Sequence, residues 1–183
     1  MTCTVIVGGF YGDEGKGKII AYLSIKDDPK IAVRGGVGAN AGHTFVYNNQ
    51  SFKVRMLPSA VLNPETKLLI GAGVLVTPEV LREESQKYNA EKRIIIDSQC
   101  GIIHESHMKR DMNDSHLKKI VGTTGSGTGP ANSDRALRIL KLAKDIDELK
   151  QYIGNVSNIV NQSIDENQNV FIEGTQGTFL SLY

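Results

Sequence analysis

The amino-acid sequence predicts an α/β protein built on a mostly parallel, twisted sheet with helices on both faces. Three observations predict this class. Apolar runs of strand length alternate with helical segments, these runs lack clean polar alternation, and the first of them leads through a glycine-rich loop into a helix. Strands without such alternation are typical of a parallel sheet that helices cover on both sides. We therefore expect one α/β nucleotide-binding domain over residues 1–183, with a phosphate-loop-like first βα unit.

The first elements follow from short apolar runs and their boundaries. Residues 4–7 form an apolar strand, residues 12–18 a glycine-rich loop, and residues 19–23 the start of a helix. A second strand is expected at 31–33. Two β-rich runs at 45–47 and 52–56 flank an Asn-Asn pair, which predicts a hairpin.

The later elements carry clearer start signals. The apolar run 67–70 predicts a strand, and Thr77 followed by Pro78 suits the N-cap and first position of a helix that reaches about residue 88. The isoleucines in 93–96 predict another strand. Leucine periodicity predicts a long helix over 134–153, followed by a helix at 156–164 and a last strand at 170–172.

Composition and charge exclude several classes of protein. Hydrophobic residues make up 40% of the 183 residues and charged residues 22%, which is ordinary for a globular protein. The net charge of +1 gives no electrostatic reason to expect nucleic acid or a membrane surface as partner. Two cysteines are too few for a disulfide framework, so we expect a cytoplasmic protein with Cys3 buried in the first strand.

The loop 12–18 is the strongest candidate site. Glycines before a helix let backbone N–H groups turn toward an anion, and the spacing from Gly12 to Lys18 fits the phosphate-loop pattern G-x-x-x-x-G-K. The pattern breaks at Ile19, where a magnesium-binding Ser or Thr is usual. Asp13 lies inside the loop, where a carboxylate would repel phosphates unless it binds a metal or transfers a proton. A plain turn is the alternative.

Two further motifs combine glycine with chemically active side chains. His43 follows the small residues 40–42, and its imidazole suits proton transfer near neutral pH, although a histidine that caps a turn fits equally well. Hydroxyls alternate with glycines in 122–130, which fits either a second anion-binding loop or a flexible surface loop. Arg138 is expected on the helix after it. Residues 173–178 follow the last strand, where open parallel sheets bind ligands.

The motif His-Glu-Ser-His at 104–107 is one residue too short for a zinc helix, so we expect His104, His107 and His116 at the surface.

These motifs together resemble the adenylosuccinate synthetase family. Its motifs occur in the same order at 12–18, 40–44, 122–125, 129–131 and 173–178, and the short segment between Arg138 and Gln176 is similar to the compact archaeal form. The resemblance implies a GTP-dependent ligase that joins IMP and L-aspartate into adenylosuccinate through 6-phosphoryl-IMP.

The resemblance also implies roles for individual residues. Asp13 removes the N1 proton of IMP, His43 acts as acid toward the moving phosphoryl group, Lys16 contacts that group, and Mg²⁺ is held in part by Asp13 and the carbonyl of Gly42. GTP is bound by Gly12, Asp13, Glu14, Gly15, Lys16, Gly17, Lys18, Gly42, His43 and Thr44. IMP is bound by Asp13, Glu14, Gly15, Lys16, Asn40, Ala41, Gly42, His43, Thr124, Arg138 and Gln176. Arg138 reaches IMP in the neighbouring subunit, which makes the active unit a homodimer.

The sequence departs from the family pattern in three ways. Ser126 stands where many members carry arginine, and residues 10–11 are Phe-Tyr in place of Gln-Trp. The aspartate-binding loop and the guanine-recognising segment of the family are not found within residues 1–183, so we expect a truncated N-terminal portion. Two other functions stay open, a different phosphate-loop ligase that activates an oxyanion with ATP, and a nucleotide-binding fragment without turnover.

Overall fold

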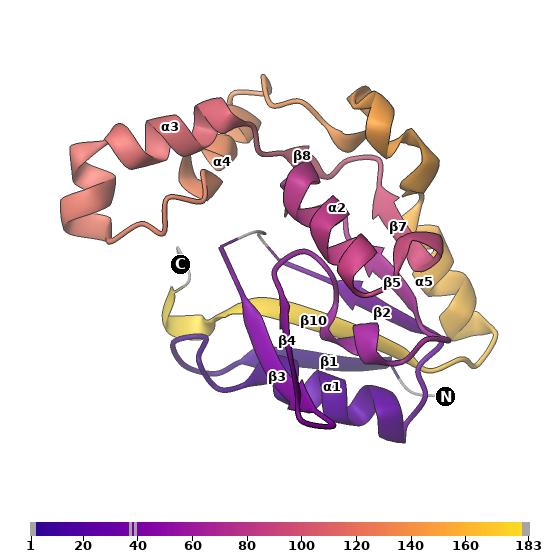
Figure 1. Cartoon of the computed structure of the whole chain (residues 1–183). Coiled ribbons are helices and arrows are strands. Elements are labelled where there is room, and N and C mark those ends of the chain that lie inside the picture. The colour runs from indigo at the N-terminus through magenta and orange to yellow at the C-terminus, as the bar shows by residue number, and fades with distance from the viewer. Residues whose placement is uncertain (1–2, 37, 39, 181–183) are drawn as a thin grey trace.

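A six-stranded parallel sheet forms the centre of the computed structural model, which describes residues 3–36, 38 and 40–180. The strand order is β1-β10-β2-β5-β7-β9, and every pairing in this sheet is parallel (Figure 1). The fold class predicted from the sequence is therefore confirmed. The strands are β1 (Cys3–Gly8), β2 (Ile31–Arg34), β5 (Lys67–Ile70), β7 (Ile94–Asp97), β9 (Ile153–Gly154) and β10 (Val170–Gly177).

Helices cover both faces of this sheet, and the side chains of β2 show which helix lies on which face. Ala32 points into the larger core, where it joins Ile20 of α1 (Lys16–Lys26) and Leu81 of α2 (Pro78–Lys87). The neighbouring Val33 points into a second cluster with Val156 of α5 (Val156–Asp165). Burying each large apolar side chain contributes about 1.5–3 kcal/mol, so these two clusters fix the helices on the sheet.

Three smaller units surround the sheet. The antiparallel hairpin consists of β3 (His43–Tyr47) and β4 (Gln50–Val54), as predicted, and two short parallel strands pair as β6 (Leu75–Val76) and β8 (Gly101–Ile102). Helices α3 (Glu105–Asn113) and α4 (Thr128–Ala136) pack against each other and lie beyond the carboxyl ends of the central strands (Figure 1).

The predicted helix over 134–153 is wrong. Helix α4 ends at Ala136, and 3₁₀ turns occupy Ala143–Asp145 and Asp147–Tyr152. The segment between them runs along β8: Ile102 N donates to the Lys141 carbonyl at 2.9 Å, and Ala143 N donates to the Cys100 carbonyl at 2.8 Å. These bonds to a neighbouring strand replace the helical hydrogen bonds that leucine periodicity alone predicts.

Three further expectations need correction. Cys3 is exposed, because β1 is the edge strand of the sheet. His107 is buried, with Nε2 3.1 Å from Asp134 Oδ2 across the α3–α4 contact. Residues 173–177 do not follow the last strand but belong to it, since pairing with β1 continues as far as Gly8 opposite Gly177. Among the described residues, no helix is long and apolar enough to cross a membrane.

Candidate functional site

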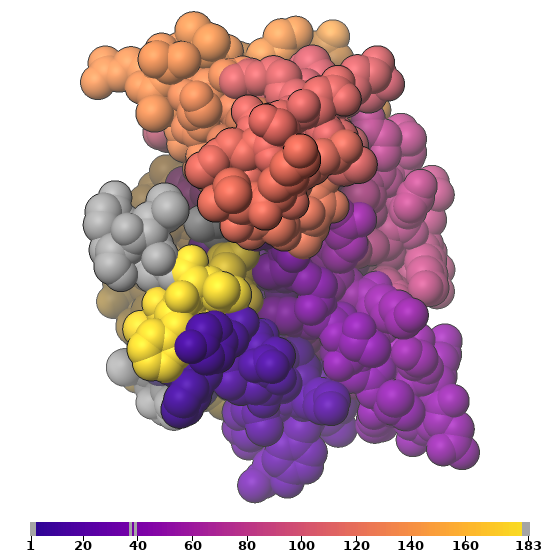
Figure 2. All heavy atoms as spheres, turned by 90° about the vertical axis from the view of Figure 1, so that its left-hand side faces the viewer, coloured from indigo at the N-terminus to yellow at the C-terminus, as the bar shows by residue number. Residues whose placement is uncertain are grey.

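The candidate residues gather where β1, β10 and β2 end. These three strands are neighbours and run in the same direction, so the loop after Gly8, the end of β10 and the segment after Arg34 meet at one edge of the sheet. Figure 2, which looks at this side, shows the loop after β1 in indigo beside the yellow end of β10, with the salmon α3 region above them. Carboxyl ends of parallel strands are where such sheets bind ligands.

In the loop after β1, hydrogen-bond donors contact the carboxylate of Glu14, which is itself a residue of the loop. Phe10 N donates to Glu14 Oε1 at 2.6 Å, and Lys16 Nζ lies 3.3 Å from Glu14 Oε2 and from the Gly12 carbonyl. Hydrogen bonds from the backbone of Glu14 and Phe10, with Lys16, lower the pKa of Glu14 to about 2. The donors of this loop therefore converge on the loop's own carboxylate, and binding of a phosphate in its place stays a prediction.

Glycine is required at several positions of this loop. Gly12 and Gly15 have φ values of 89° and 86°, in the left-handed region that other residues rarely adopt. A Cβ added to Gly8, just before the loop, would lie 2.9 Å from the Gln176 carbonyl oxygen, and one added to Gly177 would lie 2.1 Å from the Phe10 carbonyl oxygen. The end of β10 thus packs directly against the loop, which a side chain at Gly177 would push away.

His43 lies against the beginning of α1, next to the loop. It starts β3, and its Cβ would be 2.6 Å from a Cβ added to Gly17, so only glycine in this first turn lets the imidazole approach so closely. The imidazole is buried, and its Nε2 has no hydrogen-bond partner among the described residues. The fold therefore brings the predicted histidine and the predicted phosphate loop together, although they come from separate strands.

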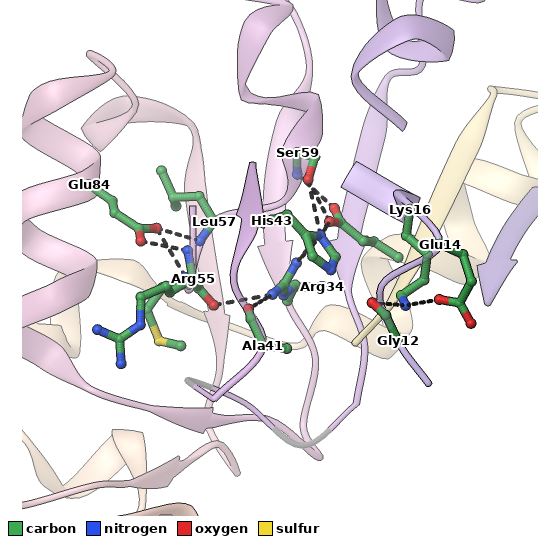
Figure 3. A network of polar contacts seen from close by, with 12 residues as sticks. Gly12, Glu14, Lys16, Arg34, Ala41, His43, Arg55, Leu57, Ser59 and Glu84 are labelled. Carbon is green, nitrogen blue, oxygen red and sulfur yellow. Dashed lines mark hydrogen bonds and ion pairs between the residues drawn. The ribbon is translucent and has the colours of Figure 1, made fainter. Parts of the chain in front are cut away.

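A buried polar cluster holds the other ring nitrogen of His43. Nδ1 contacts Glu173 Oε1, lies 2.8 Å from Arg34 Nη1 and 3.3 Å from Ser59 Oγ (Figure 3). Arg34 Nη1 also donates to Glu173 Oε1 at 2.8 Å, and both side chains are fully buried. Arg34 Nη2 donates to the Ala41 carbonyl at 2.6 Å, which ties the segment before His43 to β2.

The neighbours of Glu173 favour its ionised form. Burial by itself raises the pKa of a carboxyl, but Arg34 together with hydrogen bonds from His43 and Ser59 outweighs burial and holds the pKa of Glu173 below its usual value. The carboxylate also accepts from Ser59 N at 2.7 Å and Ser59 Oγ at 2.6 Å. A buried charge with this many partners keeps a single geometry, because each lost partner would expose it to a desolvation cost.

A second buried carboxylate holds the far end of the hairpin. Glu84 of α2 accepts from the backbone N–H groups of Arg55, Met56 and Leu57 at 2.6, 3.0 and 3.0 Å (Figure 3). Burial raises the pKa of Glu84 despite these three hydrogen bonds. The residues after β4 are thus fixed to α2. Arg34 Nη2 donates to the carbonyl of one of them, Arg55, at 3.3 Å.

The remaining predicted residues are divided between two regions. Gln176 Nε2 donates to Asn40 Oδ1 at 3.1 Å, so the fold brings these two residues together, and their role in IMP binding stays a prediction. Among the described residues, Thr124 and Arg138 form no hydrogen bond or ion pair with residues 12–18. Thr124 Oγ1 donates to Ser126 Oγ at 3.0 Å within its own loop. Arg138 is exposed, but it lies two residues past α4 with φ 61°, not on the helix that was predicted.

The loop 122–130 is tied to α3 by one acidic side chain. Asp111, which is buried, accepts from Thr123 Oγ1 at 2.7 Å and from Gly127 N at 2.8 Å. Two of the donors that could have held an anion are therefore occupied by a carboxylate. Anion binding by this loop stays a prediction.

Sequence reasoning missed Arg34 and Ser59, and it included Glu173 in the candidate motif 173–178 without giving it a role of its own. A signal for the pair of Arg34 and Glu173 is present, since they are the first charged residues after two apolar strand runs. The structure places them directly opposite each other in neighbouring parallel strands. Ser59 carries no comparable signal, because it reaches the cluster from a 3₁₀ turn at Ser59–Leu62.

Few protein groups near the loop could serve as ligands of a metal ion. No group of three or more His, Cys, Asp or Glu side chains that could hold a metal exists in the described part of the chain. Asp13 is an exposed residue of the loop and carries a carboxylate. Mg²⁺ is often held by one or two carboxylates together with the phosphates of a substrate. Asp13 could supply one such carboxylate, and binding of Mg²⁺ stays a prediction.

The parallel sheet, the glycine-rich loop at its first strand end and the histidine beside it define a phosphate-loop-like α/β protein. Comparison with known families is more specific. The family model of adenylosuccinate synthetase matches residues 5–146, and the chain belongs to this family.

Curated relatives and solved structures agree with this assignment. The adenylosuccinate synthetases of Methanocaldococcus jannaschii and Methanococcus vannielii are 58% and 55% identical to the whole of this chain, which covers 54% and 55% of their lengths. A fully ligated adenylosuccinate synthetase from Plasmodium falciparum superposes with a TM-score of 0.87 at 26% identity, over 98% of this chain and 52% of that one. A succinoaminodeoxyadenylate synthetase of cyanophage S-2L shares the fold, with a TM-score of 0.80 at 24% identity, over 99% of this chain and 53% of that one. The chain spans about half the length of the curated relatives it matches.

Proposed function

We propose that this chain supplies the phosphoryl-transfer half of an adenylosuccinate synthetase. The proposed reaction joins IMP and L-aspartate at the expense of GTP, and it yields adenylosuccinate, GDP and phosphate. The observation that carries the proposal is the meeting of the anion-binding loop and His43 at the ends of β1, β10 and β2 in a chain of this family.

In the first step, the proposed base is Asp13. Its carboxylate removes the proton from N1 of IMP, which leaves the 6-oxygen electron-rich, and this oxygen attacks the γ-phosphorus of GTP with GDP as leaving group. Lys16 and His43 contact the phosphoryl group as it moves and offset its negative charge. In the second step, the amine of aspartate displaces phosphate from 6-phosphoryl-IMP, because phosphate leaves far more readily than oxide.

Magnesium fits this scheme as an ion bound mainly by phosphate oxygens. Asp13 and the backbone carbonyl of Gly42 are the proposed protein ligands, and both residues are exposed, the first within the loop and the second in the segment before β3. The ion would neutralise charge that develops on the phosphates during transfer. An ion held in this way does not need the loop Ser or Thr, whose usual position is taken by Ile19.

The substrate contacts are proposed by position. The loop 12–18 with Gly42, His43 and Thr44 binds the GTP phosphates, and the pair Asn40–Gln176 binds IMP with help from Thr124. Arg138 is proposed to reach the IMP site of a second subunit in a homodimer. Its exposure and its place on a turn between the exposed Leu137 and Ile139 support a contact with another chain. A cytoplasmic location belongs to the same proposal.

The test measures adenylosuccinate formation from IMP, aspartate and either GTP or ATP. Two polypeptides are compared, the 183-residue chain and a longer polypeptide that continues past residue 183 with the remaining half of a relative. We expect turnover with GTP in the longer polypeptide and very little in the shorter one. Brisk turnover by the shorter chain would contradict the view that aspartate and guanine are bound by later residues. Absence of activity in both, with IMP and GTP still bound, would favour the fragment without turnover.

A different phosphate-loop ligase that uses ATP remains the second candidate. Family membership and the ordered motifs favour the synthetase over it. Preference for ATP over GTP by the longer polypeptide, with an acceptor other than IMP, would reverse this order.

A further inference from the structure

Strand β1 has a free edge in the part of the chain that the structure describes. It lies at one end of the six-stranded sheet and pairs with β10 alone (Figure 1). An edge strand presents a row of unpaired backbone N–H and C=O groups to the solvent. The sequence of β1, Cys-Thr-Val-Ile-Val-Gly, contains neither a charged residue nor proline, two of the usual devices that keep an edge from pairing with another strand. This edge is therefore open to a further strand.

One face of β1 is bare as well. Ile6 packs against the larger core, on the face of the sheet that α1 covers. Val5 and Val7, which alternate with Ile6, point to the other face, and they are 56% and 70% exposed. Val5 lies opposite Ile172 of β10, and Ile172 packs against the apolar cluster under α5. The layer that α5 forms on this face thus ends before it reaches β1.

More exposed apolar side chains gather at the carboxyl end of β1. Phe10 and Tyr11, in the loop after β1, are exposed, and so is Phe179 in the 3₁₀ turn after β10. The ring centroid of Phe179 lies 5.7 Å from that of Phe10 and 5.3 Å from that of Tyr11. Phe179 N also donates to the Phe10 carbonyl at 2.9 Å. Single exposed apolar residues are ordinary, but a group of them along one strand and its loop marks an interaction surface.

The handedness of the sheet predicts which face a helix beside β1 would cover. Crossovers between parallel strands are right-handed in almost all proteins. From β1 to β2 and from β5 to β7 the chain moves in one direction across the sheet, and α1 and α2 lie on the face of the larger core. From β9 to β10 it moves in the opposite direction, and α5 lies on the other face. A connection from β10 to a strand outside β1 repeats the second case, so its helix would cover the face of Val5 and Val7.

We propose that β1 is the docking surface for a parallel strand and its crossover helix, supplied by the half of a synthetase that this chain does not span. The strand pairs with the free edge, and an apolar side of the helix covers Val5 and Val7. The chain spans about half the length of its curated relatives, so the rest of such a relative is long enough to supply both elements. The identity of the partner rests on the proposed function, whereas the open edge and the bare face are properties of this chain.

Docking at β1 would also serve the proposed reaction. The loop 12–18 follows directly after β1, so a partner at this edge lies beside the loop. The groups that bind aspartate and guanine are expected from the same half of the synthetase. The competing occupant is a second copy of this chain, since two open edges can pair with each other.

The first experiment measures hydrogen exchange of the β1 amides by NMR, in the 183-residue chain and in the longer polypeptide. In the shorter chain we expect protection only for amides that face β10. In the longer polypeptide the amides that face outward should exchange about 100-fold more slowly or less, because paired amides exchange only when the sheet opens. Should the longer polypeptide fail to fold, the whole synthetase of Methanocaldococcus jannaschii is measured at the strand aligned with β1.

Two outcomes of this experiment would overturn the proposal. One is fast exchange of the outward amides in the folded longer polypeptide. The other is protection of these amides already in the 183-residue chain that disappears on dilution, which would assign the edge to a second copy.

The second experiment tests the bare face with Val5→Lys. Because Val5 is exposed, the substitution should change the urea midpoint of the 183-residue chain little. In the longer polypeptide it should lower the midpoint by about 1 M or more, since the ammonium would be buried under the helix. Val46→Lys, at an exposed valine of β3, is the matched control and should act alike on both polypeptides. Equal effects of Val5→Lys on the two would contradict the proposal.

Activity separates this proposal from the proposed function. If the outward amides become protected in the longer polypeptide and no adenylosuccinate forms, docking at β1 stands and the proposed function fails. If adenylosuccinate forms while these amides exchange freely, the proposed function stands and docking at β1 fails.

Discussion

The loop after β1 and the cluster behind His43 lie at neighbouring strand ends, but different forces hold them. The loop is mostly exposed, and glycine conformations together with a few contacts around Glu14 and Lys16 set its shape. The cluster of Arg34, Ser59 and Glu173 is buried and held by charged hydrogen bonds. Substitutions in the loop should therefore change binding and rate, whereas substitutions in the cluster should also change stability.

The largest effect on stability is expected from a substitution that breaks the cluster. Arg34→Met leaves the carboxylate of Glu173 buried without its cation, and removing one partner of a buried pair typically costs about 3–5 kcal/mol. Urea unfolding of the 183-residue chain measures this loss. The control is Arg82→Met, whose pair with Glu148 at 3.5 Å is exposed and should contribute nothing measurable. Equal stability of the two variants would show that the cluster is not a source of stability.

A substitution in the loop should lower the reaction rate and leave stability unchanged. Asp13→Asn in the longer polypeptide is expected to lower kcat by on the order of a hundredfold or more, typical for the loss of a general base, while the midpoint of thermal unfolding stays unchanged because the residue is exposed. Asp165→Asn, near the exposed end of α5, is the control. A wild-type rate in Asp13→Asn would remove this residue from its proposed role.

The contact between the two regions can be tested at Gly17. Its Ala variant places a Cβ 2.6 Å from His43 Cβ and 3.1 Å from Ser59 Oγ, so the imidazole or the helix must move. Overpacking of this kind costs about 1–3 kcal/mol, which exceeds the gain of up to about 1 kcal/mol from replacing glycine in a helix. Gly129→Ala in α4 meets no atom within 4 Å and should stabilise the chain instead. A stabilised Gly17→Ala would show that His43 does not press on α1.

The smallest effect is the pH dependence of stability. The folded chain lowers the pKa of Glu173, so its ionised form contributes stability above the unfolded pKa of 4.5, and this is lost as the pH falls through the folded pKa. Burial raises the pKa of Glu84, so its contribution is greatest below 4.5 and is lost as the pH rises through the folded pKa.

Glu173→Gln should accordingly flatten the loss of stability in acid, and Glu84→Gln should steepen it. Urea unfolding between about pH 3 and pH 6 measures both slopes. Identical slopes in the two variants would contradict the opposite pKa shifts.

The same contrast explains what the sequence reveals. The loop was predictable because local features mark it, the spacing of Gly12, Gly17 and Lys18 after an apolar strand. The cluster was not, because Arg34 and Glu173 are 139 residues apart and meet only once β10 lies beside β2. Each of them by itself is an ordinary charged residue that follows an apolar run.

Other differences also come from tertiary structure. Cys3 was expected to be buried, but whether a strand is central or at an edge depends on strand order, which apolar runs do not encode. The periodic leucines after Asp134 favour a helix locally, but hydrogen bonds from Ile102 N to the Lys141 carbonyl and from Ala143 N to the Cys100 carbonyl hold that segment along β8. Propensity is a weak prior that such contacts override.

The position of β10 has a consequence for synthesis of the protein. It fills the gap between β1 and β2, yet it spans Val170–Gly177 and is the last strand of the described chain to leave the ribosome. Until then no strand lies between β1 and β2. The pairing of β10 with β1 must also close a loop of more than a hundred residues. A nascent chain in that interval exposes open strand edges, which favour pairing with other chains until β10 is made.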